Sequence, residues 1–232
     1  MNVAVSFSGG KDSTRTVEWC LKNHNVKCLL TFYPKNMESY MLHSVNLDVA
    51  RLAAKALGLK HKRVVVSGEK EKEVEEMKEA IRRLKVDAIA CGGIASNYQK
   101  ERFEKIAREL GIKLFAPFWG VDGEKFLRET IDLGYEVIIV SVSTLGLDKS
   151  WLGRRIDHET VDELLKLKKF GLNIVFEGGE AETLVLDGPI FKKRIEILES
   201  EIIWDDKTNS GYLNIVKAKL VGKDKTLDET IK

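Results

Sequence analysis

Phe7-Ser8-Gly9-Gly10-Lys11-Asp12-Ser13 stands between a short apolar run, residues 2–7, and a stretch with helical spacing, residues 12–23. Glycines let a backbone approach an anion closely, and the N-terminus of a helix adds roughly half a positive charge. Lys11 would add a mobile full charge, and the two serines would add hydroxyl donors. The stretch therefore predicts a phosphate-binding turn where the first strand meets the first helix.

The order of residues in this turn excludes two common nucleotide-binding motifs. A Walker A loop has four residues between its first Gly and the Gly-Lys-Ser/Thr end, and a dinucleotide turn reads GxGxxG. A tight turn capped by Asp12 or Ser13, with no ligand, is the structural alternative. Ser-Gly-Gly-Lys-Asp-Ser resembles instead the PP-loop of the ATP pyrophosphatases. This resemblance implies an enzyme that splits ATP into AMP and pyrophosphate.

Strand-like and helix-like segments alternate through the first half of the chain. The expected strands are residues 2–7, 27–32, 62–66, 87–91 and 113–116, and the expected helices are residues 12–23, 47–57, 74–84 and 98–110. Strands that alternate with helices at this spacing form a parallel sheet covered on both faces. We therefore expect an α/β fold with a doubly wound parallel sheet, which the PP-loop resemblance places in the HUP class.

The pattern changes after Trp119. A helix near residues 124–133, an apolar run at 137–142 and a helix near 159–170 precede two strands, residues 195–203 and 212–220. The turn-rich stretch between these two strands predicts an antiparallel hairpin. We therefore expect a nucleotide-binding domain over residues 1–120 and a second, smaller α+β domain over residues 121–232 that binds the substrate.

Composition argues against several classes of protein. Lys and Arg number 38 against 36 Asp and Glu, so a net charge of +2 gives no reason to expect nucleic acid or membrane as a partner. The three cysteines lack CxxC spacing, which supports neither a disulfide framework nor a zinc site. No apolar stretch approaches the roughly 20 residues of a membrane span. We expect a cytoplasmic protein whose oligomeric state stays open, a homo-oligomer included.

The ligands of doubly wound sheets bind at the carboxyl ends of the strands. Asp12 is the expected Mg²⁺ ligand, with the metal bound through ATP, and both Lys11 and Asp12 are expected to take part in catalysis. His43 is a weaker candidate at the same edge. The expected ATP-binding residues are Phe7, Ser8, Gly9, Gly10, Lys11, Asp12, Ser13, Leu30, Thr31, Phe32 and Gly92.

Three further motifs carry polar or aromatic side chains. They are Gly92-Gly93-Ile94-Ala95-Ser96-Asn97-Tyr98-Gln99 with Arg102 and Glu104 behind it, the two tryptophan stretches Ala116-Pro117-Phe118-Trp119-Gly120 and Trp151-Leu152-Gly153-Arg154, and Phe176 to Pro189. The alternatives are a helix cap at Ser96 or Asn97, core positions for the tryptophans, and a solvated acidic turn. Like charges crowded round a glycine pair favour a site, because they cost free energy unless a cation or a reacting group compensates them.

Together with the PP-loop, these motifs resemble the diphthine–ammonia ligase family over nearly the whole chain. Glu-Gly-Gly-Glu-x-Glu-Thr at 177–183, Ser-x-Tyr-Gln at 96–99 and Trp-Leu-Gly-Arg at 151–154 are in combination specific to it. We expect the compact archaeal form of this family, without the appended C-terminal domains of longer eukaryotic members. The resemblance implies a ligase that amidates diphthine on translation elongation factor 2 with ammonia, ATP and Mg²⁺, through an acyl-adenylate.

Diphthine carries a trimethylammonium group beside its carboxylate, and carboxylates combined with aromatic faces suit such a cation. Our hypothesis is that Glu177, Glu180 and Glu182, with Trp119 or Trp151, receive this cation. The alternative is that one of the three glutamates deprotonates the attacking nitrogen as a general base. Glu180 and Glu182 are the expected catalytic residues of this half of the site. The expected substrate-binding residues are Ser96, Tyr98, Gln99, Arg102, Trp119, Trp151, Glu177, Gly178, Gly179, Glu180, Glu182 and Thr183.

Two other functions stay open from the sequence. A PP-loop enzyme could act on another carboxylate or on a tRNA base, although the CxxC motifs or basic domain of the thiolating members are missing. A non-catalytic module could bind ATP or AMP without turnover, although such a role needs no carboxylate cluster. No glutaminase domain is recognisable, so ammonia is expected free or delivered. Cys91 lies near the site but is expected to be a packed strand residue.

Overall fold

The computed structural model describes residues 1–35, 46–69, 71–93 and 97–223. The first sheet has five parallel strands in the order β3-β2-β1-β4-β5. Its members are β1 (Asn2–Ser6), β2 (Asn25–Pro34), β3 (His61–Val66), β4 (Ala88–Ala90) and β5 (Lys113–Phe115). The expectation of a parallel, doubly wound sheet is confirmed. The direction of winding reverses between β1 and β4, so the loops after these two strands face each other at the point where such sheets bind ligands.

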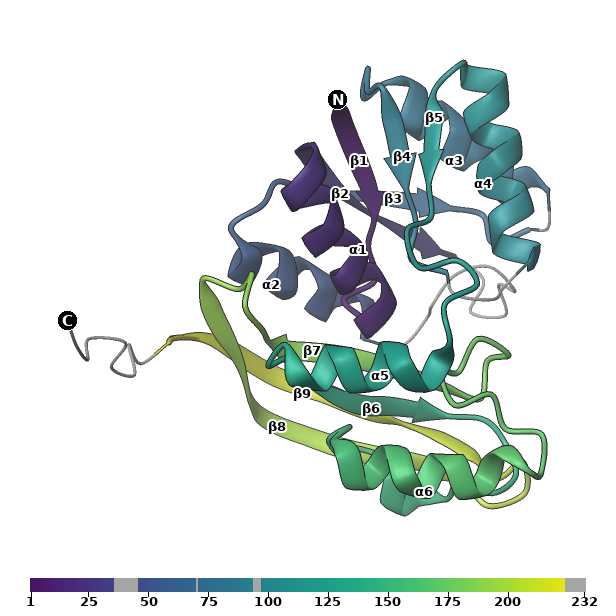
Figure 1. Cartoon of the computed structure of the whole chain (residues 1–232), viewed down its shortest axis with the longest axis vertical. Coiled ribbons are helices and arrows are strands. Elements are labelled where there is room, and N and C mark those ends of the chain that lie inside the picture. Colours follow the sequence, from purple (N-terminus) through teal and green to yellow (C-terminus); the bar gives the residue numbers. More distant parts are fainter. Residues whose placement is uncertain (36–45, 70, 94–96, 224–232) are drawn as a thin grey trace.

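Four helices cover the two faces of this sheet (Figure 1). They are α1 (Lys11–Asn23), α2 (Leu47–Leu57), α3 (Lys72–Arg82) and α4 (Asn97–Leu110). Met77 of α3 and Ile106 of α4 pack on Leu30 and Ile89, whereas Val17 of α1 packs on the other face. Gly58 ends α2 with φ 70, as its position after the helical repeat indicates.

The second sheet is antiparallel, with strand order β7-β6-β9-β8. Its long hairpin pairs Ile203 with Tyr212 and Ile195 with Leu220, as predicted, whereas β9 meets β6 only through Gly211 and Tyr212. The elements of this half are α5 (Gly123–Asp132), β6 (Glu136–Val142), the 3-10 turn η1 (Lys149–Trp151), α6 (His158–Lys168), β7 (Ala181–Asp187), β8 (Lys193–Asp205) and β9 (Ser210–Gly222).

The two sheets share one continuous hydrophobic core, and α1 and α2 lie between them (Figure 1). Val185 of β7 donates its backbone N–H to the carbonyl of Gly9 at 2.9 Å, so the second sheet borders the glycine turn. The boundary expected at residue 120 falls in the loop between β5 and α5. Within the described residues, no helix is long and apolar enough to cross a membrane.

Arg15 joins α1 to the second half of the chain from a buried position. Its Nη1 donates to the hydroxyl of Thr130 at 2.7 Å, and its Nε lies 3.0 Å from a carboxylate oxygen of Glu18. The guanidinium also lies within 6 Å of three ring centroids, those of Phe118, Phe126 and Tyr135. A buried charge with partners on several elements fixes the position of α1, and with it that of the glycine turn.

Candidate functional site

The glycine turn has the geometry of an anion cradle. Gly9 has φ +85, which favours glycine, and a Cβ on Gly10 would lie 3.1 Å from the carbonyl oxygen of Thr183. The hydroxyls of Ser8 and Ser13 face each other at 3.3 Å, and Ser13 donates to the carbonyl of Gly10. Gly10, the N-cap residue of α1, has no side chain with which to cap the helix. Hydroxyls and a helix N-terminus thus meet at one point, as phosphate binding requires.

A pocket opens beside this turn and has about 630 Å³ of empty volume, its open mouth included. The residues around it come from the ends of β1, β2 and β4 and from α4 and β7. They are Ser6, Phe7, Ser8, Gly10, Asp12, Ser13, Thr31, Phe32, Cys91, Gly92, Gln99, Phe103 and Thr183. Leu30 does not line it, because its side chain is fully buried in the sheet core.

Gly92 lets the loop after β4 press against the start of α1. A Cβ at this position would lie 2.5 Å from the carbonyl carbon of Asp12 and 2.6 Å from the amide nitrogen of Ser13. Real Cβ atoms do not approach a backbone that closely. Glycine at this position is therefore a steric requirement for bringing the two loops of the pocket together.

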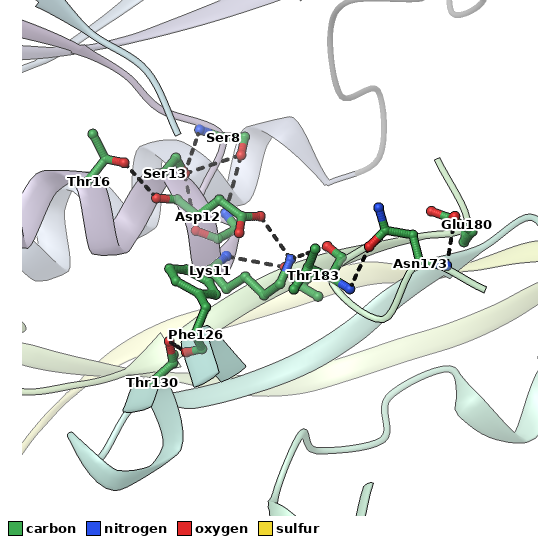
Figure 2. A network of polar contacts seen from close by, with 12 residues as sticks. Ser8, Lys11, Asp12, Ser13, Thr16, Phe126, Thr130, Asn173, Glu180 and Thr183 are labelled. Carbon is green, nitrogen blue, oxygen red and sulfur yellow. Dashed lines mark hydrogen bonds and ion pairs between the residues drawn. The ribbon is translucent and has the colours of Figure 1, made fainter. Parts of the chain in front are cut away.

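Lys11 does not supply the mobile charge that the sequence predicted. Its side chain is 2% exposed, and the ammonium donates to Oδ2 of Asp12 at 2.8 Å and to the carbonyl of Val175 at 2.7 Å (Figure 2). It also lies 5.5 Å from the ring centroid of Phe176. The side chain leaves α1 toward the second sheet rather than toward the pocket, so Lys11 ties the turn to the loop before β7.

Asp12 combines one satisfied oxygen with one unsatisfied oxygen. Oδ2 accepts from Lys11, whereas Oδ1 is buried and has no hydrogen-bond partner in the part of the chain that the structure describes. The residue lines the pocket. A buried carboxylate oxygen without a donor is costly unless a ligand or a cation meets it. Asp12 therefore fits the predicted role of a metal-side carboxylate.

The acidic stretch is built around Glu180. Its two carboxylate oxygens accept from the backbone amides of Asn173 at 3.2 Å and Gly178 at 2.8 Å. The amide side chain of Asn173 in turn accepts from the N–H of Val175 at 3.1 Å, whose carbonyl binds Lys11 (Figure 2). Each carboxylate oxygen of Glu180 thus accepts one backbone N–H, so this residue holds the turn together.

Glu177 and Glu182 lie on either side of Glu180. Burial, with the negative charges of Glu177 and Glu104 nearby, raises the pKa of the Cys91 thiol to about 12. Cys91 is 8% exposed and belongs to the core on one face of the first sheet, so it is a packed residue, as predicted. Glu182 lies opposite Ser141 in the β6–β7 pairing and is half-buried.

The remaining predicted residues divide into three groups. Gln99 and Thr183 line the pocket, and Thr183 Oγ1 also accepts from the amide of Lys11 at 3.2 Å. Arg102 forms an ion pair with Glu71 at 2.8 Å. The two tryptophans each lie against a cation: the Lys100 ammonium is 4.4 Å from the Trp119 ring centroid, and the Arg154 guanidinium is 4.6 Å from the ring centroid of buried Trp151. Gly178 and Gly179 form the acidic turn with Glu177. His43, Ser96 and the side chain of Tyr98 lie outside the described residues.

Two contributors to the site were missed by sequence reasoning. Asn173, which connects Val175 to Glu180, lies in an ordinary Leu-Asn-Ile run that carries no signal. His61 of β3 places its Nε2 2.8 Å from Thr31 Oγ1, which donates to the carbonyl of Phe7 at 2.5 Å. His61 is the first residue of β3, at the amino end of that strand, and its sequence context carries no signal of this contact.

Comparisons with known proteins agree over both halves of the chain. The family model for the diphthamide synthase N-terminal domain matches residues 1–114, and the model for the diphthamide synthase C-terminal domain matches residues 122–221. Diphthine–ammonia ligase of Schizosaccharomyces pombe is 34% identical over 97% of this chain, which spans 40% of that protein. The protein of the same name from Homo sapiens is 32% identical, and the match covers 88% of this chain and 85% of that protein. The one from Danio rerio is 31% identical, and the match covers the full length of both chains.

Proposed function

We propose that this chain, which belongs to the diphthamide synthase family, amidates diphthine with ammonia while it splits ATP into AMP and pyrophosphate. The observation that carries the proposal is the connected network from the glycine turn to the acidic stretch, Asp12–Lys11–Val175–Asn173–Glu180. A nucleotide-activating half and an acceptor-binding half are joined by hydrogen bonds. Binding of nucleotide alone would not need the second half.

The nucleotide lies in the pocket at the carboxyl ends of β1, β2 and β4. Ser8, Gly10 and Ser13 hold the β- and γ-phosphates, and Thr31 and Phe32 border the nucleoside. A carboxylate oxygen of diphthine attacks the α-phosphorus, and the bond between this phosphorus and the bridging oxygen breaks. Hydroxyl and amide donors that are already oriented stabilise the charge that develops on the departing pyrophosphate. Such preoriented donors are the source of transition-state stabilisation in sites of this kind.

Asp12 is the residue that would hold a divalent cation. Mg²⁺ usually binds through one or two carboxylates and the phosphates of a substrate rather than in an all-protein cage. The described residues contain no group of three or more His, Cys, Asp or Glu that could form such a cage. When bound, Mg²⁺ would shield the charge that develops on pyrophosphate. Asp12→Asn should raise the Mg²⁺ concentration required for half-maximal rate, and an unchanged requirement would contradict this assignment.

The acceptor enters from the side of the acidic stretch. Glu177 and Glu182, with the half-buried ring of Trp119, receive its trimethylammonium group, and a cation already lies on that ring in the form of Lys100. Ammonia attacks the acyl carbon of the adenylate, AMP leaves, and a glutamate takes the proton from nitrogen. Glu182 is the carboxylate that we assign to this step, because both oxygens of Glu180 are bound to backbone amides.

The acceptor protein is translation elongation factor 2, and the reaction takes place in the cytoplasm. Residues 1–120 activate ATP, and residues 121–232 select the acceptor. The test is to incubate the chain with ATP, Mg²⁺, ammonium and diphthine-bearing elongation factor 2. Equal amounts of AMP and amide support the proposal. AMP that appears only with tRNA or a small carboxylate, or ATP that binds without turnover, would replace it with one of the two other functions.

A further inference from the structure

A second hollow lies on the other side of the acidic stretch, between the loop after β6 and the loop after α6. It has about 1,050 Å³ of empty volume, including its open mouth, and Leu167, Leu172 and Glu180 line it. Leu145 and Phe170 stand at its rim and are 85% and 76% exposed. The next most exposed large apolar residue of the described chain is Val216, at 54%. Single exposed apolar residues are ordinary, but two that share one hollow indicate a contact surface.

The loop that carries Leu145 is held rigidly. Asn209 donates its side-chain amide to the carbonyls of Thr144 at 3.0 Å and Leu147 at 3.1 Å. Ser143 donates its N–H to the carbonyl of Glu180 at 2.8 Å. The exposure of Leu145 is therefore built into a fixed loop, and a partner would lose little conformational entropy on this side when it binds.

Hydrogen bonds of Glu180 link the hollow to the proposed active site. The backbone carbonyl of this residue binds the loop of Leu145, and its carboxylate binds the loop that follows Phe170 through Asn173. From Asn173 the hydrogen bonds lead through Val175 to Lys11 in the glycine turn (Figure 2). A molecule seated in the hollow thus lies beside the route by which the acceptor enters.

Three lysines stand in the chain next to Leu167 and Phe170 of the hollow, and one carboxylate-bearing residue, Glu180, lines it. Lys166 and Lys168 are in the last turn of α6, and Lys169 places its ammonium 5.0 Å from the ring centroid of Phe170. A partner that inserts an apolar side chain here would be favoured by carboxylates beside that side chain.

We propose that this hollow docks the acceptor protein by a segment away from the modified residue, with an apolar anchor between Leu145 and Phe170 and acidic residues facing the lysines. This inference rests on the proposed function, because the reacting residue belongs to a folded protein. A modified side chain alone would fill only the pocket between the glycine turn and the acidic stretch, and a whole protein needs a second point of contact. The hollow is linked to that pocket through hydrogen-bonded residues.

The test uses Leu145→Asp and Phe170→Asp, with Val216→Asp as the matched control on β9. Affinity for diphthine-bearing elongation factor 2 is measured by calorimetry without ATP, and ATP affinity is measured separately. Each rim variant should weaken binding of the elongation factor by about 10-fold or more, as loss of a central apolar anchor does, with ATP affinity and the control unchanged. Unchanged affinity in both rim variants, equal weakening in the control, or no binding by the unaltered chain would overturn the inference.

Failure of the docking inference is distinguishable from failure of the proposed function. If the unaltered chain binds the elongation factor through this rim but forms no amide, the function is wrong and the docking surface stands. If it forms amide and both rim variants keep the same KM for the elongation factor, the function stands and the docking surface is wrong. Light scattering measures whether the chain self-associates. If the rim variants lose self-association but keep their affinity for the elongation factor, a second copy of the chain occupies the hollow and the docking inference is wrong.

Discussion

The ammonium of Lys11 lies 2.7 Å from the carbonyl oxygen of Val175, so the glycine turn and the loop before β7 are joined by a buried hydrogen bond across 164 residues of sequence. A charge-assisted bond of this kind is stronger than a neutral one. It couples the position of the phosphate-binding turn to that of the acidic stretch. A substitution at Lys11 should consequently affect the fold as well as the nucleotide.

We expect Lys11→Met to lower the free energy of unfolding by about 1–3 kcal/mol, because Asp12 and the carbonyl of Val175 lose their donor. Turnover with ATP should be lost together with this stability. Lys22→Met is the control on the same helix, since the Lys22 side chain is 66% exposed and its ion pair should contribute less than about 1 kcal/mol. Urea unfolding checks both variants. If Lys11→Met loses ATP binding while its free energy of unfolding is unchanged, Lys11 contacts the phosphates and this account of its role is wrong.

Gly92→Ala should damage the nucleotide pocket, whereas Gly93→Ala should not. A Cβ on Gly92 would lie 2.5 Å from the backbone of Asp12. Among the described residues, a Cβ on Gly93 would meet only Gln99 Oε1, at 4.0 Å. Relief of the first clash must move the turn or the loop, at a cost of about 1–3 kcal/mol. Titration with ATP should show affinity at least about 10-fold weaker for Gly92→Ala. Equal affinities of the two variants would show that the loops can separate freely.

Glu180→Gln and Glu182→Gln should fail in different ways. At Glu180 a glutamine keeps one acceptor and turns its NH₂ group toward a backbone N–H, so thermal and urea unfolding should show a loss of about 1–3 kcal/mol. Glu182→Gln should keep its stability and lose about 10²-fold or more in kcat, as removal of a general base does. If both variants keep the full ligase rate, neither carboxylate serves the reaction.

Acid should destabilise the nucleotide half through His61. Burial and the nearby charge of Arg51 hold the pKa of His61 below its ordinary value of 6.5. The unfolded chain then binds the proton more tightly than the folded chain, so the contribution of His61 to stability is complete above pH 6.5 and declines as the pH falls. Between pH 7 and pH 5, the unfolding free energy should fall more steeply for the unaltered chain than for His61→Gln. Identical slopes would mean that His61 titrates normally.

Local chemistry explains what the sequence could predict. The turn at Gly9-Gly10 between a strand and a helix could be predicted because only certain residues make such a turn. The position of the pocket could be predicted because ligands bind where a doubly wound sheet reverses its winding. The hairpin of β8 and β9 was equally accessible, since a turn-rich stretch separates two apolar runs. In each case the decisive contacts are close in sequence or follow from a general rule of topology.

Long-range contacts explain the remainder. Lys11 was expected to reach phosphate, but its partner is a backbone carbonyl that no residue type reveals. Glu180 was expected at the acceptor site, but its contacts with the amides of Asn173 and Gly178 depend on the path of the chain and could not be predicted. Trp151 was a candidate for the acceptor site, yet it is buried beneath Arg154. Each outcome depends on how the second sheet packs against the first.

The most direct test of the account follows the carboxylate oxygens of diphthine, labelled with ¹⁸O. Attack on the α-phosphorus followed by displacement with ammonia leaves one oxygen on the amide and transfers the other to AMP. The account predicts one ¹⁸O atom in AMP for each amide formed, detected by mass spectrometry, and unlabelled pyrophosphate. Unlabelled AMP, or ADP with labelled phosphate, would contradict activation of the acceptor as an acyl-adenylate.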